Sequence, residues 1–226
     1  MTQRITVIDY GMGNLRSVAK AVEHVVAEGD EVLVSDDPKL ILESDRVVFP
    51  GQGAARDCMA AISDHHLNRA VLDAARSKPF LGICMGQQVL LDFSEENDGT
   101  PLLGMIPGRV RRFHGGIAPD GEVMKIPHMG WNRVFQRHQH PLWHGIDQQS
   151  RFYFVHSYYA DPAQPELVAA TTDYGASFAS AIADGNLFAV QFHPEKSADI
   201  GLRLLRNFVQ WQPSIEEYSR AADTRD

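Results

Sequence analysis

The stretch Pro79-Phe-Leu-Gly-Ile-Cys-Met-Gly-Gln-Gln-Val-Leu-Leu91 joins a short apolar run to one cysteine, Cys84, and then to a run with helical character. Glycines stand two residues before and two residues after that cysteine. This spacing is typical of a nucleophile elbow, a tight strand-to-helix turn that side chains would crowd. We expect a strand over Phe80–Ile83 and a helix over Gln87–Phe93, whose N-terminus favours a thiolate. A buried core cysteine is the alternative.

Strand-like and helix-like segments alternate through the first half of the chain. Short β-branched runs that stop at turn residues predict strands, and apolar residues at helical spacing predict helices. The expected strands are Arg4–Asp9, Glu31–Val34 and Arg46–Phe49, and the expected helices are Leu15–Glu28, Ala54–Ile62 and Leu67–Arg76. This order predicts an α/β fold with a doubly wound, mostly parallel sheet flanked by helices.

After Asn97 the pattern changes to short strand-like runs separated by glycine, proline and aspartate, which predicts additional antiparallel strands. The runs are Arg109–Phe113, Glu122–Ile126, Arg133–Gln136, Phe152–Tyr159, Leu167–Thr172 and Ala176–Ala183. Apolar residues at helical spacing predict a last helix over Ala198–Trp211. We expect a single domain over residues 1–212 and a polar tail over residues 213–226.

Composition excludes several classes of function. With 226 residues, 44% hydrophobic and 22% charged, the chain is typical of a globular protein. Its net charge of −8 argues against a nucleic-acid footprint, which needs a basic face. Only two cysteines are present, 26 residues apart, which indicates no disulfide framework and fits a reducing cytoplasm. We find neither a signal peptide nor a membrane-spanning run, and we expect a cytoplasmic protein.

Three further patterns are weak. Gly11-Met-Gly13 resembles the start of a dinucleotide-binding fingerprint, but the third glycine is missing, so we interpret it as a structural turn. Cys58 falls inside an expected helix and is predicted to be a small core residue rather than a second active thiol. His138, His140 and His144 have no carboxylate or thiolate at ligand spacing, so neither a metal nor another cofactor is predicted.

A cysteine nucleophile needs a base, and the segment Leu187-Phe-Ala-Val-Gln-Phe-His-Pro-Glu195 offers one at the end of an expected strand. In an extended backbone residues i and i+2 point to one side, so His193 and Glu195 should be neighbours. A carboxylate beside an imidazole fixes its tautomer and stabilises its cation. We therefore predict a Cys84–His193–Glu195 triad. The alternative is a strand end with solvent-exposed polar residues.

The loop Pro50-Gly-Gln-Gly53 directly follows an expected strand, and its glycines free the backbone to approach a ligand. Attack by a thiolate on an amide passes through a tetrahedral oxyanion, which backbone N–H groups can stabilise. We expect the N–H groups of Gln52 and Met85 to serve as these donors.

Together, Pro50-Gly-Gln-Gly53, Gly82-Ile-Cys-Met-Gly-Gln-Gln88 and Gln191-Phe-His-Pro-Glu195 resemble the triad (class I) glutamine amidotransferases in order and separation. Within this class, segments Ile8–Leu15, Pro127–Asn132 and Phe154–Tyr159 are similar to those of the glutaminase subunits of imidazole glycerol phosphate synthase. The resemblance implies glutamine as substrate, with glutamate and ammonia as products. It also implies a heterodimer with a (β/α)8-barrel cyclase subunit, which would use the ammonia in histidine biosynthesis to make imidazole glycerol phosphate and aminoimidazole carboxamide ribotide.

The same resemblance assigns the substrate contacts. Glutamine would be held by the Gln88 side chain and by the backbone of four residues, which are Gly51, Gly53, Ser157 and Tyr158. Pro127–Asn132 would face the partner. The sequence departs from the family pattern at Gln52, where an apolar residue is usual, and this leaves open how the oxyanion loop is held.

Two other classes of function are alternatives to a glutaminase subunit. A stand-alone cysteine hydrolase, such as a peptidase or an esterase, would use the same triad for its own product. A binding module with an inactive site would be expected to lack one triad residue, and all three are present.

Overall fold

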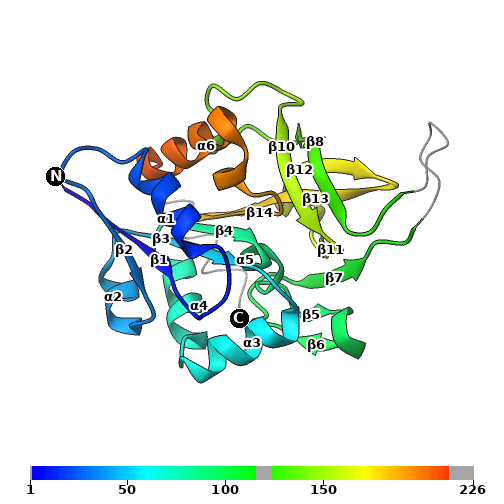
Figure 1. The fold of residues 1–226 in the computed structure, drawn as a ribbon, viewed down its shortest axis with the longest axis horizontal. Helices are drawn as coiled ribbons and strands as arrows, with labels where there is room; N and C mark the ends of the chain where they lie inside the picture. Colours follow the sequence, from blue (N-terminus) through cyan, green and yellow to red (C-terminus); the bar gives the residue numbers. More distant parts are fainter. Residues whose placement is uncertain (1, 116–123, 214–226) are drawn as a thin grey trace.

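The structure, a computed structural model, describes residues 2–115 and 124–213 of the chain. Parallel strands in the order β2-β1-β3-β4-β14 form one half of the main sheet, with β2 at its edge (Figure 1). They are β1 (Arg4–Ile8), β2 (Glu31–Ser35), β3 (Arg46–Gly51), β4 (Phe80–Cys84) and β14 (Leu187–Val190). Because β4 and β14 are parallel neighbours, their carboxyl ends meet at one edge of the sheet.

Helices cover both faces of these strands (Figure 1). The helices are α1 (Leu15–Glu23) and α6 (Ala198–Gln210) on one face, and α2 (Pro38–Glu43), α3 (Ala55–Asp64) and α4 (Asn68–Ser77) on the other. In β3, Val48 packs in the same core as α1 and α6, whereas Val47 and Phe49 pack with α2, α3 and α4. Side chains alternate between the faces of a strand, so both faces are apolar. The predicted doubly wound α/β fold is confirmed.

Beyond β14 the main sheet continues mostly through antiparallel strands, as predicted. In sheet order these are β13 (Ala176–Asp184), β11 (Tyr158–Pro162) and β7 (Gly108–Arg112), then β5 (Phe93–Ser94) and β6 (Thr100–Pro101), with β12 (Val168–Tyr174) and β9 (Phe135–Gln136) branching from β13. Strands β8 (His128–Arg133) and β10 (Arg151–His156) form a separate antiparallel pair.

The helix predicted over Gln87–Phe93 is wrong in its extent, because α5 (Met85–Gln88) is a single turn. The carbonyl groups of residues 89–91 accept hydrogen bonds from N–H groups of residues 103–106 instead of continuing the helix. The N–H groups of residues 103–106 therefore replace the N–H groups that a longer helix would have supplied. Helix α1 also ends early, at Glu23 rather than Glu28, and the chain then turns into β2 through Gly29, whose φ is +93°.

Three expected strands differ from the structure. The run predicted over Arg133–Gln136 belongs to the end of β8 and to β9. The run Phe152–Tyr159 is broken at Ser157, where the chain passes from β10 to β11 and changes sheets. The predicted strand Glu122–Ile126 lies partly outside the described residues, and its described part, residues 124–126, is not a strand. Residues 214–226 of the predicted tail also lie outside the described residues.

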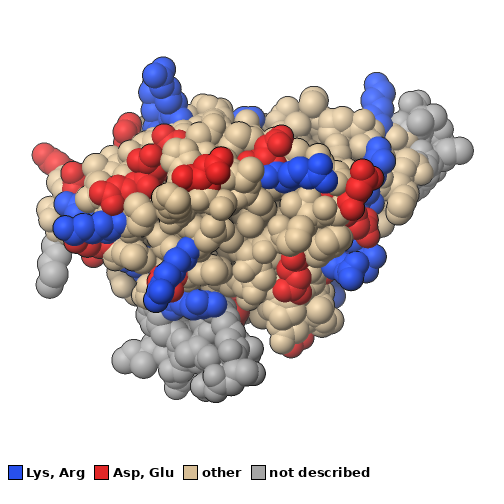
Figure 2. All heavy atoms as spheres, turned by 90° about the horizontal axis from the view of Figure 1, so that it is seen from below, with Lys and Arg blue, Asp and Glu red and all other residues tan. Residues whose placement is uncertain are grey.

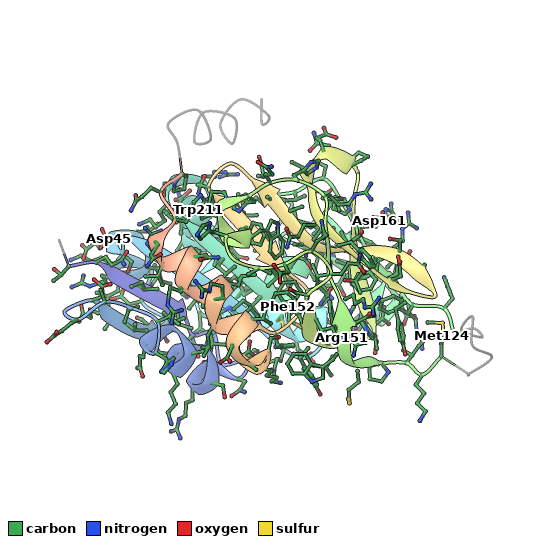
Figure 3. The ribbon with its side chains drawn as sticks, turned by 90° about the horizontal axis from the view of Figure 1, so that it is seen from above. Asp45, Met124, Arg151, Phe152, Asp161 and Trp211 are labelled. Carbon is green, nitrogen blue, oxygen red and sulfur yellow. The ribbon has the colours of Figure 1, made fainter. Side chains whose placement is uncertain are left out.

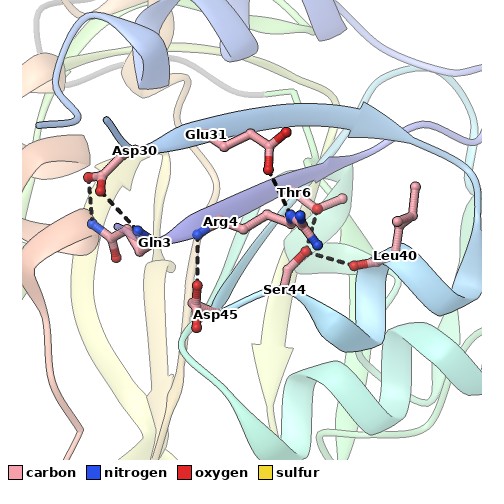
Figure 4. Close-up of polar contacts among 8 residues, drawn as sticks. All are labelled: Gln3, Arg4, Thr6, Asp30, Glu31, Leu40, Ser44 and Asp45. Atoms are coloured by element: carbon pink, nitrogen blue, oxygen red, sulfur yellow. Dashed lines mark hydrogen bonds and ion pairs between the residues drawn. The ribbon is translucent and has the colours of Figure 1, made fainter. Parts of the chain in front are cut away.

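Side-chain hydrogen bonds fix the first strand between its neighbours (Figure 4). Arg4 Nε donates to Glu31 of β2 over 2.8 Å, and the Arg4 N–H donates to the Asp45 carboxylate over 2.7 Å. The hydroxyl groups of Thr6 and Ser44 lie 2.5 Å apart in the interior. These contacts join β1 to β2 and to the segment that leads into β3.

Helix α6 packs over the sheet, with Phe152 of β10 beside it and Trp211 after its last residue (Figure 3). Both side chains are buried. Arg46, at the start of β3, donates to the carbonyl oxygen of Trp211 over 2.5 Å. The C-terminal end of the helix is thereby attached to the central sheet.

On the face seen from below, basic and acidic side chains are interspersed (Figure 2). In the part of the chain that the structure describes, no helix has both the length and the apolar character needed to cross a membrane.

Candidate active site

The turn at Cys84 has the geometry of a nucleophile elbow. Cys84 ends β4 and adopts φ 55° and ψ −109°, a backbone conformation that is uncommon for a residue with a side chain. A Cβ atom at Gly86 would lie 1.8 Å from the carbonyl oxygen of Phe49, and one at Gly82 would lie 2.7 Å from that of Gly86. The two glycines are therefore required for this turn, as the sequence predicted.

His193 and Glu195 lie together, as predicted, but not along a continuous strand. Strand β14 ends at Val190, and residues Pro194–Lys196 form a 3-10 turn. His193 Nδ1 lies 2.8 Å from Glu195 Oε1, and the two side chains are only 2% and 1% exposed. The hydroxyl group of Ser197 donates to the His193 carbonyl oxygen over 2.6 Å and closes the turn.

The electrostatic surroundings of His193 favour its charged form. Burial alone would lower the pKa of the imidazole, but the negative charges of Cys84 and Glu195 outweigh it and raise the pKa to about 10. The Nε2 atom of His193 is buried and lies on the side of the ring toward Cys84. One ring nitrogen is thus held by a carboxylate, and the other is available for proton transfer.

Two glutamine side chains connect Cys84 to β11. Gln191 Nε2 lies 3.7 Å from Cys84 Sγ, and Gln191 Oε1 accepts from Gln88 Nε2 over 2.8 Å. The same Gln88 nitrogen donates to the carbonyl oxygen of Tyr158 over 2.8 Å. Both hydrogens of the Gln88 amide are therefore used within the protein, which leaves Oε1 as its group for a ligand.

The loop after β3 packs against the elbow. A Cβ atom at Gly51 would lie 2.2 Å from Tyr10 Oη and 2.9 Å from Met85 Cβ, so this position requires glycine. The turn predicted at Gly11–Gly13 supports the loop from outside, since a Cβ at Gly13 would lie 3.5 Å from the Gly51 Cα. Cys58 is fully buried in α3, as predicted, and burial raises its pKa to about 11.

These elements enclose a pocket of about 390 Å³. Most of the predicted site residues line it: Gln52, Gly53, Cys84, Met85, Gln88, Ser157, Tyr158 and His193. Gly51 and Glu195 are not part of the lining; Gly51 lies behind Met85, and Glu195 reaches the pocket only through His193.

The lining also contains residues that sequence reasoning did not find as site residues, which are Glu96, Val155, His156 and Lys196. Glu96 accepts from the N–H of Ala55 over 2.7 Å and so is fixed at the first turn of α3. Its sequence neighbourhood, Ser-Glu-Glu-Asn-Asp, carries no motif. Gln191 could have been found, because the period-two rule that placed Glu195 beside His193 also places Gln191 on that side.

The three histidines considered as a metal cluster do not form one in the structure. His140 Nδ1 accepts from the N–H of Leu142 over 3.1 Å and caps a 3-10 turn. Within residues 2–115 and 124–213, no group of three or more histidine, cysteine, aspartate or glutamate side chains is arranged to hold a metal ion.

Comparison with known proteins identifies the family. The sequence model of the family described as glutamine amidotransferase class-I matches residues 6–211. The chain is 61% identical over 211 residues to imidazole glycerol phosphate synthase subunit HisH of Methylococcus capsulatus, covering 92% of this chain and 97% of the relative. It is 56% identical over 225 residues to the HisH subunit of Thiobacillus denitrificans, covering 99% and 97%. The chain belongs to the HisH family of class I glutamine amidotransferases.

Solved structures agree with this family assignment at the level of the fold. PurLQS from Thermotoga maritima superposes with a TM-score of 0.68 at 18% identity, covering 93% of this chain and 99% of that one. A glutamine amidotransferase from the same organism has a TM-score of 0.55 at 18% identity, covering 93% and 82%. The sheet and helices of this chain are thus shared with both of these solved structures.

Proposed function

We propose that this chain hydrolyses glutamine through a Cys84–His193–Glu195 triad and supplies the ammonia to a cyclase subunit in histidine biosynthesis. The observation that supports it most strongly is the meeting of the elbow cysteine with a buried imidazole–carboxylate pair in one pocket. His193 takes or gives the proton through Nε2, while Glu195 holds Nδ1 and stabilises the imidazolium.

The reaction proceeds in two halves. The Cys84 thiolate attacks the side-chain carbonyl carbon of glutamine, and the resulting oxyanion is stabilised by the N–H groups of Gln52 and Met85. When the C–N bond breaks, the nitrogen leaves as ammonia with a proton from His193. A water molecule, deprotonated by His193, then attacks the thioester and releases glutamate with the free thiol.

The pocket also carries groups that suit the amino-acid end of glutamine. The carboxylate of Glu96 and the Oε1 atom of Gln88 are acceptors, which match the three donors of an α-ammonium group. Ser157 and Tyr158 also line the pocket, and their backbone N–H groups are the proposed partners of the α-carboxylate.

The proposed partner is a separate (β/α)8-barrel cyclase subunit, bound as a heterodimer at Pro127–Asn132. Pro127 lines the pocket, and Met129 and Trp131 of β8 are 62% and 49% exposed. Large apolar side chains exposed beside a pocket are typical of an interaction surface. Ammonia released in the pocket would therefore be close to the docked subunit.

The test compares two nitrogen sources in the complex with the cyclase subunit. Cys84→Ala should abolish glutamine-dependent synthesis of imidazole glycerol phosphate but leave synthesis from ammonium salts near the wild-type rate, because only the nitrogen supply is cut. Equal loss from both sources would show that Cys84 is structural. Wild-type chain that releases no glutamate in the complex would reject the proposal as a whole.

A further inference from the structure

Two buried histidines face each other across the two-stranded sheet. His128 of β8 is opposite His156 of β10 in the strand register, and His128 Nδ1 lies 3.0 Å from His156 Nε2. The residues are 3% and 7% exposed. Their surroundings are aromatic: the His128 ring stacks on Tyr174 and on Phe154, with ring centroids 4.0 and 4.9 Å away. Burial lowers the pKa of His128 to about 4 and that of His156 to about 3, so both are neutral near pH 7.

The hydrogen bonds of this pair fit one arrangement of protons. The carbonyl oxygen of Tyr158 can only accept, so His156 Nδ1, 2.8 Å away, carries the proton. The Nε2 atom of a neutral His156 is then an acceptor, and His128 Nδ1 must donate to it. His128 Nε2 is left as an acceptor, and Asn132 Nδ2 donates to it over 3.3 Å. Asn132 thus donates to His128, His128 donates to His156, and His156 donates to the Tyr158 carbonyl oxygen at the pocket. These hydrogen bonds form one series that runs toward the pocket.

The series ends on the atom that holds Gln88. The Tyr158 carbonyl oxygen accepts from His156 and also from Gln88 Nε2. His156 is part of the pocket lining, yet both of its ring nitrogens are already used, so it has no polar atom to offer a substrate. Any effect of His156 on substrate must therefore pass through Tyr158 and Gln88.

We propose that His128 and His156 are positioning residues, which hold the carbonyl group of Tyr158 and, through it, the side chain of Gln88 in the orientation that binds glutamine. The proposal rests on the proposed glutaminase function, because it takes Gln88 as a substrate-binding residue. A merely structural role would require only that the two rings fill the aromatic core, and a phenylalanine would serve that purpose.

The experiment uses substitutions at His156, assayed for glutamine hydrolysis in the complex with the cyclase subunit. His156→Phe keeps the ring but removes both hydrogen bonds, and it should raise KM for glutamine about tenfold with kcat changed less than about threefold. His156→Asn places an amide nitrogen near the position of Nδ1 and should keep KM within about twofold of wild type. The matched control is Tyr174→Phe, which removes a hydroxyl group from the same aromatic cluster without touching the series.

A double substitution tests whether His156 acts through Gln88. In a Gln88→Ala background, His156→Phe should raise KM no more than about twofold further, because the group it positions is gone. Independent, multiplying effects would overturn the proposal. So would an unchanged KM in His156→Phe, or an Asn variant as defective as the Phe variant while both remain folded.

The proton arrangement gives a readout that does not depend on catalytic activity. In long-range proton–nitrogen NMR spectra of the histidine-labelled wild-type chain at pH 7, both imidazoles should be neutral with the proton on Nδ1. The signals of the pair are identified by their loss in His128→Asn and His156→Asn. A proton on Nε2 of either ring overturns the proposal, even where His156→Phe does not fold. A wild-type chain without glutaminase activity would reject the proposed function instead, whatever the spectra show.

Discussion

The thiol of Cys58 donates a hydrogen bond to the backbone carbonyl oxygen of Gln52, with 3.3 Å between the sulfur and the oxygen. Cys58 lies in α3, and Gln52 is at the centre of the glycine-flanked loop after β3. The bond restrains the peptide group between Gln52 and Gly53, which Gly53 would otherwise leave free to rotate. It is a contact that holds the loop proposed to carry an oxyanion donor, in a position where the sequence alone predicted only a core residue.

Removing this bond should slow the chemistry rather than weaken substrate binding. We expect Cys58→Ala to lower kcat for glutamine about threefold to tenfold, which is the effect of one ordinary hydrogen bond on a transition-state contact. Cys58→Ser keeps a donor and serves as the control. Steady-state kinetics of both variants in the complex provide the measurement, and an alanine variant with unchanged kcat would show that the bond does not orient the loop.

The roles of His193 and Glu195 predict a graded loss of activity. His193→Ala removes the group that moves the proton, which should cost roughly 10²–10⁴-fold in kcat. Glu195→Gln leaves the imidazole in place and keeps an acceptor oxygen near Nδ1, so it should lose less. Single-turnover rates of thioester formation would measure both, with circular dichroism as the check on folding. A larger loss in Glu195→Gln would reverse the division of roles.

The turn at Gly86 predicts a selective steric effect. A Cβ atom there would lie 1.8 Å from the Phe49 carbonyl oxygen, which is backbone and has little freedom to move. Gly86→Ala should therefore lower the free energy of unfolding by about 3 kcal/mol or more, above the usual range for overpacking. Gly115→Ala is the control, because a Cβ at Gly115 would have no neighbour within 4 Å. Urea unfolding of both variants tests this, and equal stabilities would contradict the elbow geometry.

Local features of the site were predictable, and contacts made across the fold were not. The glycines around Cys84 and the proline after His193 restrict their own neighbours, so the elbow and the imidazole–carboxylate pair follow from short segments. By contrast, His128 meets His156 only because β8 and β10 pair in one register across 28 residues. Glu96 reaches the pocket from a loop whose sequence has no distinguishing pattern. Helix α5 stops early because N–H groups of residues 103–106 donate to the carbonyl oxygens of residues 89–91, which a longer helix would have used.

The buried pair His128 and His156 predicts how stability depends on pH. Both folded-state pKa values lie below the ordinary value, near 4 and 3, so the unfolded chain binds more protons below about pH 6.5. Stability should therefore fall as pH drops from about 6.5 toward 4, by up to roughly 1.4 kcal/mol per pH unit for each histidine.

Urea unfolding at pH 7 and pH 5 measures this dependence, and His156→Asn supplies the comparison. Carboxylates titrate alike in both proteins, so they cancel in the difference between the two slopes. The slope of the free energy of unfolding against pH should be smaller in the variant, by the equivalent of about one bound proton. If the two proteins had the same slope, His156 would not be buried in its neutral form.

The exposed face of β8 predicts that this chain alone is a slow glutaminase and that the cyclase subunit activates it. A donor N–H at Gln52 must point into the pocket; it belongs to the peptide group between Gly51 and Gln52, which the Cys58 bond to the Gln52 carbonyl does not hold, and Gly51 allows that group to turn away. If the inward state is a few per cent of the population, a partner that favours it by about 3 kcal/mol makes it dominant. The initial rate of glutamine hydrolysis should therefore rise from the free chain to the complex, and again when the cyclase subunit of the complex holds its nucleotide substrate. Trp131→Ala, which removes a half-exposed side chain of that face, should reduce the stimulation and leave the slow rate of the free chain unchanged. A free chain as fast as the liganded complex would exclude the switch, because no inactive population would remain for the partner to shift.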